Sequence, residues 1–490
     1  MEVPKKPRVR EANRSQYLLR PTDVEKLVDD EHPVRAIWEF VCRLDLSAFY
    51  AAIEAVEGEP GRSAWDPRVM VAIWVYAYSR GIGSAREIER RCEYDPAFQW
   101  LTGMEVINHH SLSDFRVTEK ERLDELFRQV LGLLTADGLI EMERVMHDGT
   151  KIKARASGKT FRREPRIREF LKLAEDQIKA MGAPEDDTYS KREAKAKERA
   201  GREKKQKLEL ALKELEKVRQ AKTGKEKEQA RVSVTDPEAR NMKQSDGGYA
   251  PSYNAQISTD SKHGIVIAVG VSQSNPDWPE MMPALDRIEG NCGKLPKQFV
   301  VDGGYSSHEN VTAAAEKSVD LFAPIVDSST GGSNAAKAHG IAEGFTIDKF
   351  EYDSTSDSFR CPAGKQLKLY GKTEVKGRPR WLYRAKHSDC LTCAFKPSCC
   401  PKSLTCGRSL HVLSESAHAT AFKKKMETDW AKAIYKLRAP IAEFSNAWLK
   451  AKIGLRQFSV TSAKKAHMEL TWACMAMYIQ HWGRLRWQTA

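Results

Sequence analysis

Two aspartates have surroundings that suit the binding of a divalent metal. Asp302 ends the apolar run 299–301 in FVVDGGYSS, and two glycines follow it. Asp148 lies inside LIEMERVMHDGTKIKARA, which alternates apolar and polar residues as a strand does. A mixed sheet can set these strands side by side, where two carboxylates repel unless a cation neutralises them. Carboxylate oxygens favour Mg²⁺ or Mn²⁺. The alternative is that each Asp-Gly pair only caps a turn.

A third acid, Glu443, lies in YKLRAPIAEFSNAWLKAKIGLRQF. Pro440 suits the first turn of a helix. Glu443 and Lys450 are seven residues apart, so they share one face of that helix. The acid can complete a metal site while the lysine touches phosphate, and the alternative is an exposed pair on a surface helix. His147 and Asp148 face opposite ways on an alternating strand, so we expect His147 to be a core residue rather than a ligand.

A group of cysteines has spacing that can build a tetrahedral zinc site. The segments FRCPAG and DCLTCAFKPSCC contain Cys361, the pair Cys390 and Cys393, and then Cys399 and Cys400. We predict that Cys361, Cys390, Cys393 and Cys399 hold a structural zinc ion that stabilises a small insertion. The alternative is a set of reduced cysteines that only pack. A disulfide is not expected, because nothing in the sequence indicates export.

The charge balance of the chain favours a polyanionic partner. The 490 residues carry 80 Lys and Arg against 67 Asp and Glu, which gives a formal net charge of +13. Nucleic acid is the first expectation and an anionic membrane the second, while a basic surface without a partner is the alternative. The basic N-terminus lacks the apolar core of a secretory signal, and no apolar run is long enough to span a bilayer. We therefore expect a cytoplasmic protein.

The pattern of elements predicts an α/β core with an all-α N-terminal domain and two insertions. Residues 1–136 have helical periodicity. Residues 137–330 alternate strands and helices as a mixed sheet flanked by helices does, and a charged insertion at 162–231 suggests a projecting helical pair or a partly ordered arm. Residues 331–412 form a Cys-rich insertion that opens on a Gly- and Ser-rich stretch. Residues 413–490 return to helices.

The N-terminal helices are short, are joined by tight turns and carry several arginines. This arrangement suits a helix-turn-helix reader of DNA. A helical bundle with a solvated basic face explains the pattern equally well. The arginines that would contact DNA under the first interpretation are Arg86, Arg90, Arg91 and Arg116.

Together these segments resemble the DDE transposases of bacterial insertion sequences. The resemblance lies in HDGTKIKA around Asp148, in VVDGGYSS around Asp302, and in a Tyr-Arg-Glu-Lys signature. The stretch TDPEARNMKQSDGGYAPSYNAQISTD is similar to the family's lead-in to its second and third core strands, and NHHSLSDFR resembles the close of its helical domain. The similarity runs from about residue 17 to 485. The signature residues are Tyr435, Arg438, Glu443 and Lys450.

The resemblance implies an RNase H-like core that cuts DNA at the ends of a mobile element and joins those ends to a target. Two Mg²⁺ or Mn²⁺ ions would be held by Asp148, Asp302 and Glu443. Arg438 and Lys450 would bind phosphates, and Tyr435 would contact the DNA backbone or pack.

The implied partners are double-stranded DNA, as terminal inverted repeats and target, and a second copy of the chain in the DNA complex. The implied location is the bacterial nucleoid. Two other readings stay open: a transposase-derived DNA-binding protein that no longer cuts, and a metal-dependent nuclease of the same fold.

Overall fold

The computed structural model describes residues 21–55, 63–117, 120–181, 191–324, 339–353, 355–375, 378–403, 405–413 and 417–489. The basic N-terminus and the Gly- and Ser-rich opening of the second insertion, up to residue 338, lie outside these residues. The chain divides into two compact units. The first comprises Met1–Gln129, Lys452–Leu455 and Thr471–Ala490, and the second comprises Val130–Ala451 and Arg456–Leu470. The C-terminal helices predicted for 413–490 therefore contribute to both units.

The first unit is helical, which confirms the helical character predicted for the N-terminal region. Its most buried element is α3 (Pro67–Ser79), which is capped by Asp66 and begins with a proline. Trp74 and Tyr78 of α3 are fully buried. Around it lie η1 (Val24–Leu27), α1 (Pro33–Cys42), α2 (Ser47–Tyr50), α4 (Ala85–Cys92), α5 (Pro96–Thr102), α6 (His109–Val117), most of α7 (Lys120–Ala136) and the end of α18 (Ala463–Thr489).

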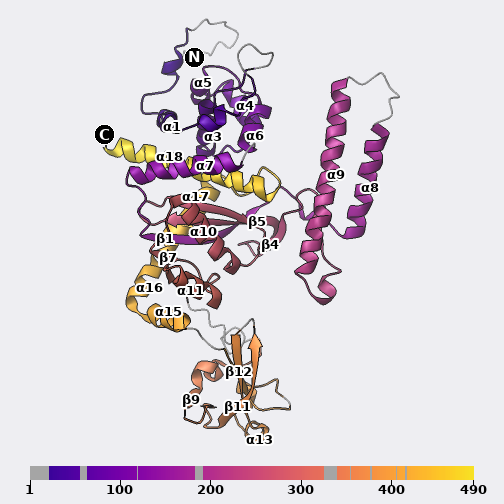
Figure 1. Ribbon diagram of the computed structural model, residues 1–490, viewed down its shortest axis with the longest axis vertical. Coiled ribbons are helices and arrows are strands. Elements are labelled where there is room, and N and C mark those ends of the chain that lie inside the picture. Colours follow the sequence, from indigo (N-terminus) through magenta and orange to yellow (C-terminus); the bar gives the residue numbers. More distant parts are fainter. Residues whose placement is uncertain are drawn as a thin grey trace, which may run out of the picture. The chain divides into compact units, whose positions relative to one another are not determined.

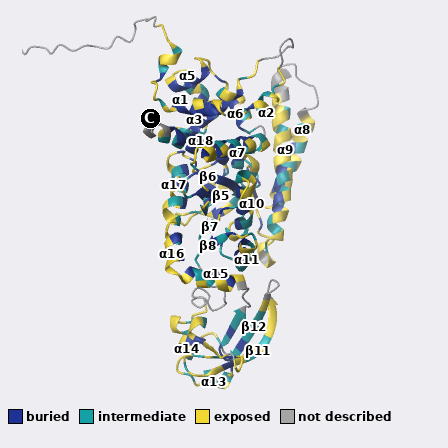
Figure 2. Cartoon of the chain, turned by 60° about the vertical axis from the view of Figure 1, so that its left-hand side comes forward, coloured by how far each residue is buried: buried dark blue, intermediate teal, exposed yellow. Residues whose placement is uncertain are grey.

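The second unit is built on a mixed sheet, as the alternation of elements predicted. The sheet has the order β4-β5-β1-β7-β8, and β6 also pairs with β5. β5 is antiparallel to its neighbours, whereas β1, β7 and β8 are parallel. Figure 2 shows β5 and β6 as buried strands. The strands are β1 (Arg144–Lys153), β4 (Arg240–Lys243), β5 (Tyr249–Asp260), β6 (Val266–Ser272), β7 (Gln298–Val300) and β8 (Asp320–Phe322).

Helices flank this sheet (Figure 1). Two follow strands of the sheet directly, α10 (Met281–Cys292) and α11 (His308–Glu316). The rest come from the last part of the chain: α15 (Ala417–Glu427), α16 (Asp429–Lys436), the π-helix η7 (Ala439–Glu443) and α17 (Phe444–Ala451).

In its described part, the charged insertion forms a pair of helices, which we call the arm. Its helices α8 (Glu164–Met181) and α9 (Lys191–Gln220) lie side by side in Figures 1 and 2. They bury a small core of their own, formed by Ile167, Ala174, Leu208, Ala211 and Leu215, which the apolar positions of both helices supply. Strands β2 (Phe161–Arg162) and β3 (Val232–Ser233) pair at its base.

The Cys-rich insertion forms an antiparallel sheet of order β13-β12-β11-β10-β9. Phe350, Leu367, Tyr383 and Leu410 form its core. Its elements are β9 (Glu351–Asp353), β10 (Ser358–Arg360), β11 (Gln366–Val375), β12 (Arg378–Ala385), α13 (His387–Leu391), α14 (Lys396–Cys399) and β13 (Ser409–Leu413). The insertion also contains the short 3-10 turns η5 (Glu343–Phe345) and η6 (Ile347–Lys349), and further 3-10 turns outside it are η2 (Gly158–Thr160), η3 (Gly224–Glu226) and η4 (Trp278–Glu280).

Within the described ranges, no helix combines the length and the apolar character that crossing a membrane requires.

Candidate active site

The sheet brings Asp148 and Asp302 together. β1 and β7 are parallel, and Met146 pairs with Val300. Continuing this register by two residues sets Asp148 beside Asp302, just past the last ladder pair of β7. Paired residues of parallel strands point to the same face of a sheet, so both carboxylates lie on one face. The Asp148 side chain is 16% exposed and the Asp302 side chain 37% exposed.

A guanidinium bridges the two carboxylates. Arg438 Nη2 lies 2.8 Å from Asp148 Oδ1 and 3.9 Å from Asp302 Oδ2. Asn446 Nδ2 donates to the other oxygen of Asp148 at 2.8 Å. Burial raises the pKa of Asp148 to about 6, the Arg438 guanidinium opposes this rise, and the Asp302 carboxylate adds to it. Two carboxylates therefore lie in a partly buried environment, where the charge of one arginine offsets theirs.

The segment that carries Arg438 turns through a π-helix, η7, before α17 begins. A π-turn holds one residue more than an α-turn, so it changes which residues of the following helix face the sheet. Glu443, the last residue of η7, is exposed and makes no hydrogen bond or ion pair with any described residue. Asn446, three residues later, contacts Asp148 instead. The structure therefore brings Asp148, Asp302 and Arg438 together but leaves Glu443 outside this group.

The other two signature residues lie near the same face. Lys450 Nζ donates to Thr150 Oγ1 of β1 at 2.5 Å, and burial lowers the pKa of Lys450 while Asp148 opposes that shift. Tyr435 is half-buried. Burial raises the pKa of its hydroxyl, and Arg438 opposes the rise.

Asp277, an acid that the sequence did not single out, lies against the backbone of Gly149. Its Oδ1 accepts hydrogen bonds from Asn254 Nδ2 at 2.6 Å, from Gln256 Nε2 at 3.2 Å and from Lys151 Nζ at 3.2 Å. A Cβ on Gly149 would lie 2.7 Å from Asp277 Oδ1, so a larger residue after Asp148 would require the neighbouring side chains to shift. No sequence periodicity points to Asp277, because it lies in the irregular stretch SNPDW.

His147 is buried, as its place on the strand predicted. Its Nδ1 contacts Ser258 Oγ and its Nε2 contacts Gln256 Oε1, both at 2.8 Å. Tyr305 Oη donates to the same oxygen of Gln256 at 2.6 Å. Gln256 therefore connects the interior beneath Asp148 to Asp277.

The four N-terminal arginines have different environments within the helical unit. Arg116 is 5% exposed, and its Nη1 donates to Gly83 O at 2.7 Å and to Tyr78 Oη at 3.2 Å. Because Arg116 is buried among these partners, it has no surface to offer DNA, contrary to the expectation from the sequence. Arg90 and Arg91 both pair with Glu87 on α4, and Arg91 also pairs with Asp95. Arg86 is exposed and forms no ion pair within the described ranges.

Replacing Arg116 with Ala is expected to destabilise the helical unit by about 3 kcal/mol, because the change removes charged hydrogen bonds and the contact of the guanidinium with the Trp74 ring at 4.6 Å. Urea unfolding followed by tryptophan fluorescence measures the loss. Arg86→Ala is the control and should change stability by less than about 0.5 kcal/mol. Equal stability of the two variants would mean that Arg116 does not support the core.

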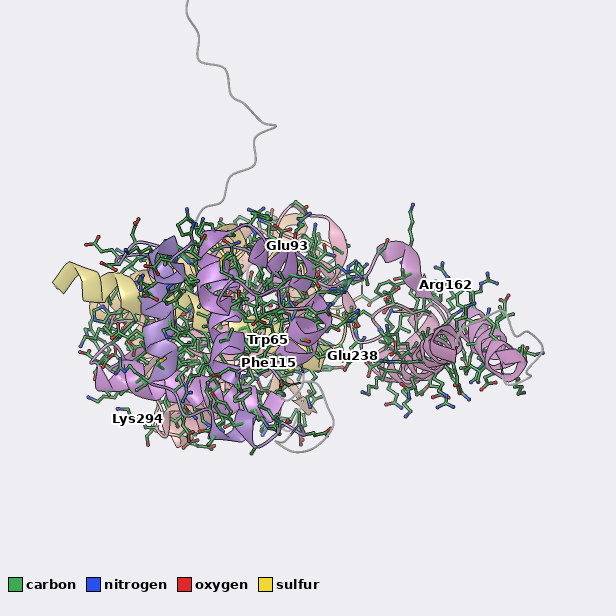
Figure 3. All side chains as sticks on the ribbon, turned by 90° about the horizontal axis from the view of Figure 1, so that it is seen from above. Trp65, Glu93, Phe115, Arg162, Glu238 and Lys294 are labelled. Carbon is green, nitrogen blue, oxygen red and sulfur yellow. The ribbon has the colours of Figure 1, made fainter. Side chains whose placement is uncertain are left out.

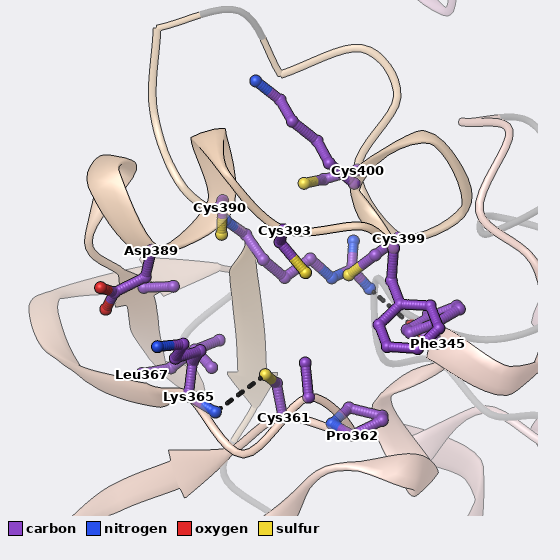
Figure 4. A pocket seen from close by; sticks show the side chains of 15 residues that line it. Phe345, Cys361, Pro362, Lys365, Leu367, Asp389, Cys390, Cys393, Cys399 and Cys400 are labelled. Atoms are coloured by element: carbon purple, nitrogen blue, oxygen red, sulfur yellow. Dashed lines mark hydrogen bonds between the residues drawn. The ribbon is translucent and has the colours of Figure 1, made fainter.

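The predicted zinc residues gather around a cavity of about 20 Å³ in the Cys-rich insertion. Cys361, Cys390, Cys393, Cys399 and Cys400 line it, and Figure 4 shows most of their sulfurs directed toward the space between the two cysteine-bearing segments. Backbone N–H groups of Lys365 and Arg408 donate to Cys361 Sγ and Cys390 Sγ, both at 3.3 Å. Burial raises the pKa of Cys399 to about 12, and the Arg408 guanidinium opposes the rise.

Across the described residues, no group of three or more His, Cys, Asp or Glu side chains is arranged closely enough to hold a metal ion. Within the described ranges, neither the acids around Asp148 nor the cysteines of the insertion form such a group.

Comparison with known families gives two matches on this chain. Residues 22–118 match the model described as Transposase domain (DUF772). Residues 360–482 match the model described as Transposase DDE domain, a range that includes Arg438, Glu443 and Lys450 but neither Asp148 nor Asp302. No curated protein matches the chain. The DDE domain implies an RNase H-like core, which agrees with the mixed sheet.

Proposed function

Because the chain is a transposase, with a DUF772 domain near its N-terminus and a catalytic DDE domain, we propose that it cuts DNA at the ends of an insertion sequence and joins those ends to target DNA. The family implies a DNA-processing enzyme that binds DNA and typically uses a divalent metal. The cut-and-join reaction and the residues below are our proposal. The observation that carries it is the parallel register that sets Asp148 beside Asp302 on one face of the sheet.

The side chains around Asp148 have the oxygen donors that a divalent metal prefers, although they do not converge on one point in this structure. Asp148 and Asp302 supply hard oxygen ligands. Asn446 Oδ1 is buried and has no hydrogen-bond partner within the described structure, so it is a further oxygen that a cation or its water can use. When bound, Mg²⁺ or Mn²⁺, as a pair of ions, activates the attacking oxygen and stabilises the leaving oxygen of the phosphodiester. We propose Asp148, Asp302 and Glu443 as the residues that hold it.

Arg438 and Lys450 would bind the DNA phosphates. In the protein alone, Arg438 neutralises the two carboxylates, so a metal that binds them would release its guanidinium. The released guanidinium would then make charge-assisted hydrogen bonds to phosphate. The Nε of Arg438 is already buried without a partner in the described structure, which leaves it a donor to offer. Tyr435 would pack against Arg438 and limit its movement.

Replacing Glu443 with Gln tests the third acid. The change keeps shape and removes the charge, so we expect cleavage to fall about a hundredfold or more, the scale of one lost electrostatic contact in a transition state. Asn446→Ala is the comparison variant and should lower cleavage less, because it removes only a neutral ligand or positioning contact. Single-turnover cleavage measures both. If Asn446→Ala loses activity and Glu443→Gln keeps it, then Asn446 rather than Glu443 completes the site.

Cleavage of the element's own ends tests the proposed function. The substrate is a plasmid that carries the DNA segment encoding the chain together with its flanking DNA. With Mg²⁺, we expect cuts at two fixed positions around that segment and joined products in a second plasmid, both read by sequencing. Binding without cuts would mean a protein that no longer cuts. Scattered cuts without joined products would mean a nuclease of the same fold.

The remaining proposals concern the partners of the chain and a structural zinc ion. Two ends must be held together for joining, so we propose that two copies of the chain act in the DNA complex, with Arg86, Arg90 and Arg91 among the contacts to the terminal repeats. We also propose that Cys361, Cys390, Cys393 and Cys399 hold a structural zinc ion. Backbone N–H groups donate to two of these sulfurs, and hydrogen bonds of this kind from outside the ligand set orient the ligands of a metal.

A further inference from the structure

A cavity of about 1220 Å³ lies at the base of the helical arm. One wall comes from the end of α9 and the residues that follow it, and the other comes from β4, the start of β5 and the loop 273–279. We call this cavity the arm groove. Glu214 of α9 is buried and ties the two walls together, because it pairs with Arg240 of β4 and accepts from Gln273 Nε2 at 3.4 Å. Figure 3 shows the side chains of the arm beside Arg162.

The arm groove is strongly basic. Its described lining holds one carboxylate, Glu226, and five cations, namely Arg163, Lys217, Lys222, Arg231 and Arg240. Glu214 forms ion pairs with both Lys217 and Arg240 and offsets one of their two charges. Arg163, Lys222 and Arg231 make no ion pair with any other described residue. Cations that gather around a cavity without matching acids create a positive potential that attracts a polyanion.

Two exposed aromatic rings line the same cavity. Tyr249 is 68% exposed and Trp278 is 47% exposed. Exposed aromatic rings beside unpaired cations are the combination with which proteins hold unpaired nucleic acid, because bases stack on the rings while cations bind the backbone. Bases within a duplex are already stacked and do not present their faces to such rings.

The loop that lines the arm groove contacts β1, the strand that carries Asp148. Its loop wall continues directly into Asp277, the neighbour of Trp278, and Asp277 lies against Gly149, the residue after Asp148. Lys151 Nζ additionally donates to the carbonyl of Asn275 at 3.2 Å, which fixes this loop to β1. A strand that leaves the groove past Trp278 would therefore pass Asp277, whose charge is near enough to Asp148 to raise the pKa of that carboxyl.

We infer that the arm groove binds a single DNA strand, the one that becomes unpaired beside the phosphodiester being cut. The phosphates of this strand would contact Arg163, Lys222 and Arg231, and its bases would stack on Trp278 and Tyr249. The inference rests on the proposed function for the identity of the strand. It adds a substrate-holding surface outside the carboxylates and gives the charged arm a role.

A charge test uses the full chain and labelled oligothymidylate, with fluorescence anisotropy as the readout. The groove variant combines Arg163→Gln, Lys222→Gln and Arg231→Gln. The control combines Lys172→Gln, Lys179→Gln and Lys213→Gln, three exposed arm cations outside the groove and without ion pairs within the described part. The groove variant should bind more weakly than the control, and its slope of log affinity against log salt should be smaller by about 2, for three lost phosphate contacts. Equal affinities and slopes would overturn the inference.

A ring test separates stacking from charge. Trp278→Ala and Tyr249→Ala should each weaken oligothymidylate binding by about fivefold or more. Trp278→Phe and Tyr249→Phe keep a ring and should restore most of the affinity. Alanine variants that bind like the unchanged chain, or phenylalanine variants that bind no better than alanine, would rule out stacking. If the alanine variants lose affinity for duplex DNA but not for oligothymidylate, the assignment to a single strand is overturned.

The proposed function and the arm groove inference can be overturned independently of each other. If the unchanged chain cuts and joins its element while the groove variant cuts at the same rate and binds oligothymidylate equally well, the arm groove inference is wrong and the proposed function stands. If the unchanged chain never cuts its element but the groove and ring variants still lose binding, the arm groove holds DNA and the cut-and-join proposal is wrong.

Discussion

Replacing Asp302 with Asn is expected to lower Mg²⁺-dependent cleavage by about a thousandfold, because an amide removes the charge that a divalent metal needs and weakens stabilisation of the transition state by several kcal/mol. Asp148→Asn should have an effect of the same size, since the two carboxylates form one site. Single-turnover cleavage of the plasmid that carries the element's ends measures both variants, and anisotropy with end DNA checks that binding remains.

The chain supplies a matched control for Asp302. Asp246 also precedes two glycines, and in both turns the aspartate accepts from the N–H of the second glycine, at 2.9 Å for Asp246 Oδ1 and 2.7 Å for Asp302 Oδ1. Asp302 therefore does cap a turn, and capping alone cannot separate the two residues. The Asp246→Asn variant should cut the element's ends at the normal rate. If Asp302→Asn behaves in the same way, Asp302 is a turn residue and the metal site is not there.

Removing zinc is expected to unfold the Cys-rich insertion. Structural zinc contributes about 10 kcal/mol or more to small domains, and this insertion has only a small core. The purified chain should contain about one zinc ion, as a four-cysteine site holds. Chelation, or Cys393→Ser, should release the zinc and expose the insertion to limited proteolysis, while the mixed sheet stays resistant.

Three further cysteine variants make that experiment more specific. Cys42→Ser changes a cysteine outside the insertion and should leave the zinc content unchanged. Comparing Cys399→Ser with Cys400→Ser identifies the fourth ligand, because both residues line the cavity and both are buried. A purified chain without zinc, whose digestion pattern Cys393→Ser does not alter, would mean that these cysteines only pack.

The pair Asp148 and Asp302 could be predicted because strands leave local marks in a sequence. The alternating segment around Asp148 predicted one strand, and the apolar run that ends at Asp302 predicted the other. A mixed sheet can place two such strands side by side. Asn446 and Asp277 could not be found in this way. Asn446 contacts Asp148 only because η7 shifts the helix after Pro440, whereas the sequence suggested a regular helix. The position of Asp277 depends on Asn254 and Gln256 of β5, which are remote in the chain.

The arginines of the N-terminal helices also could not be assigned from the sequence alone. A basic helical segment looks equally like a DNA surface or a solvated face, and nothing local distinguishes Arg116 from Arg86. The difference comes from Trp74 and Tyr78 of α3, which cover the Arg116 side chain. Tertiary contacts of this kind decide which charges remain at the surface, and composition alone cannot supply them.

The helical unit contains the last residues of α18, and this has a consequence for synthesis of the protein. Trp482 packs on Phe40 with ring centres 5.0 Å apart, and Trp472 Nε1 donates to Arg116 O at 3.2 Å. During synthesis, the helices before Gln129 therefore remain without part of their interior until α18 has been made. A product of termination before Trp472 would lack these contacts, and we expect it to be degraded rather than to compete for the ends of the element with molecules that contain α18.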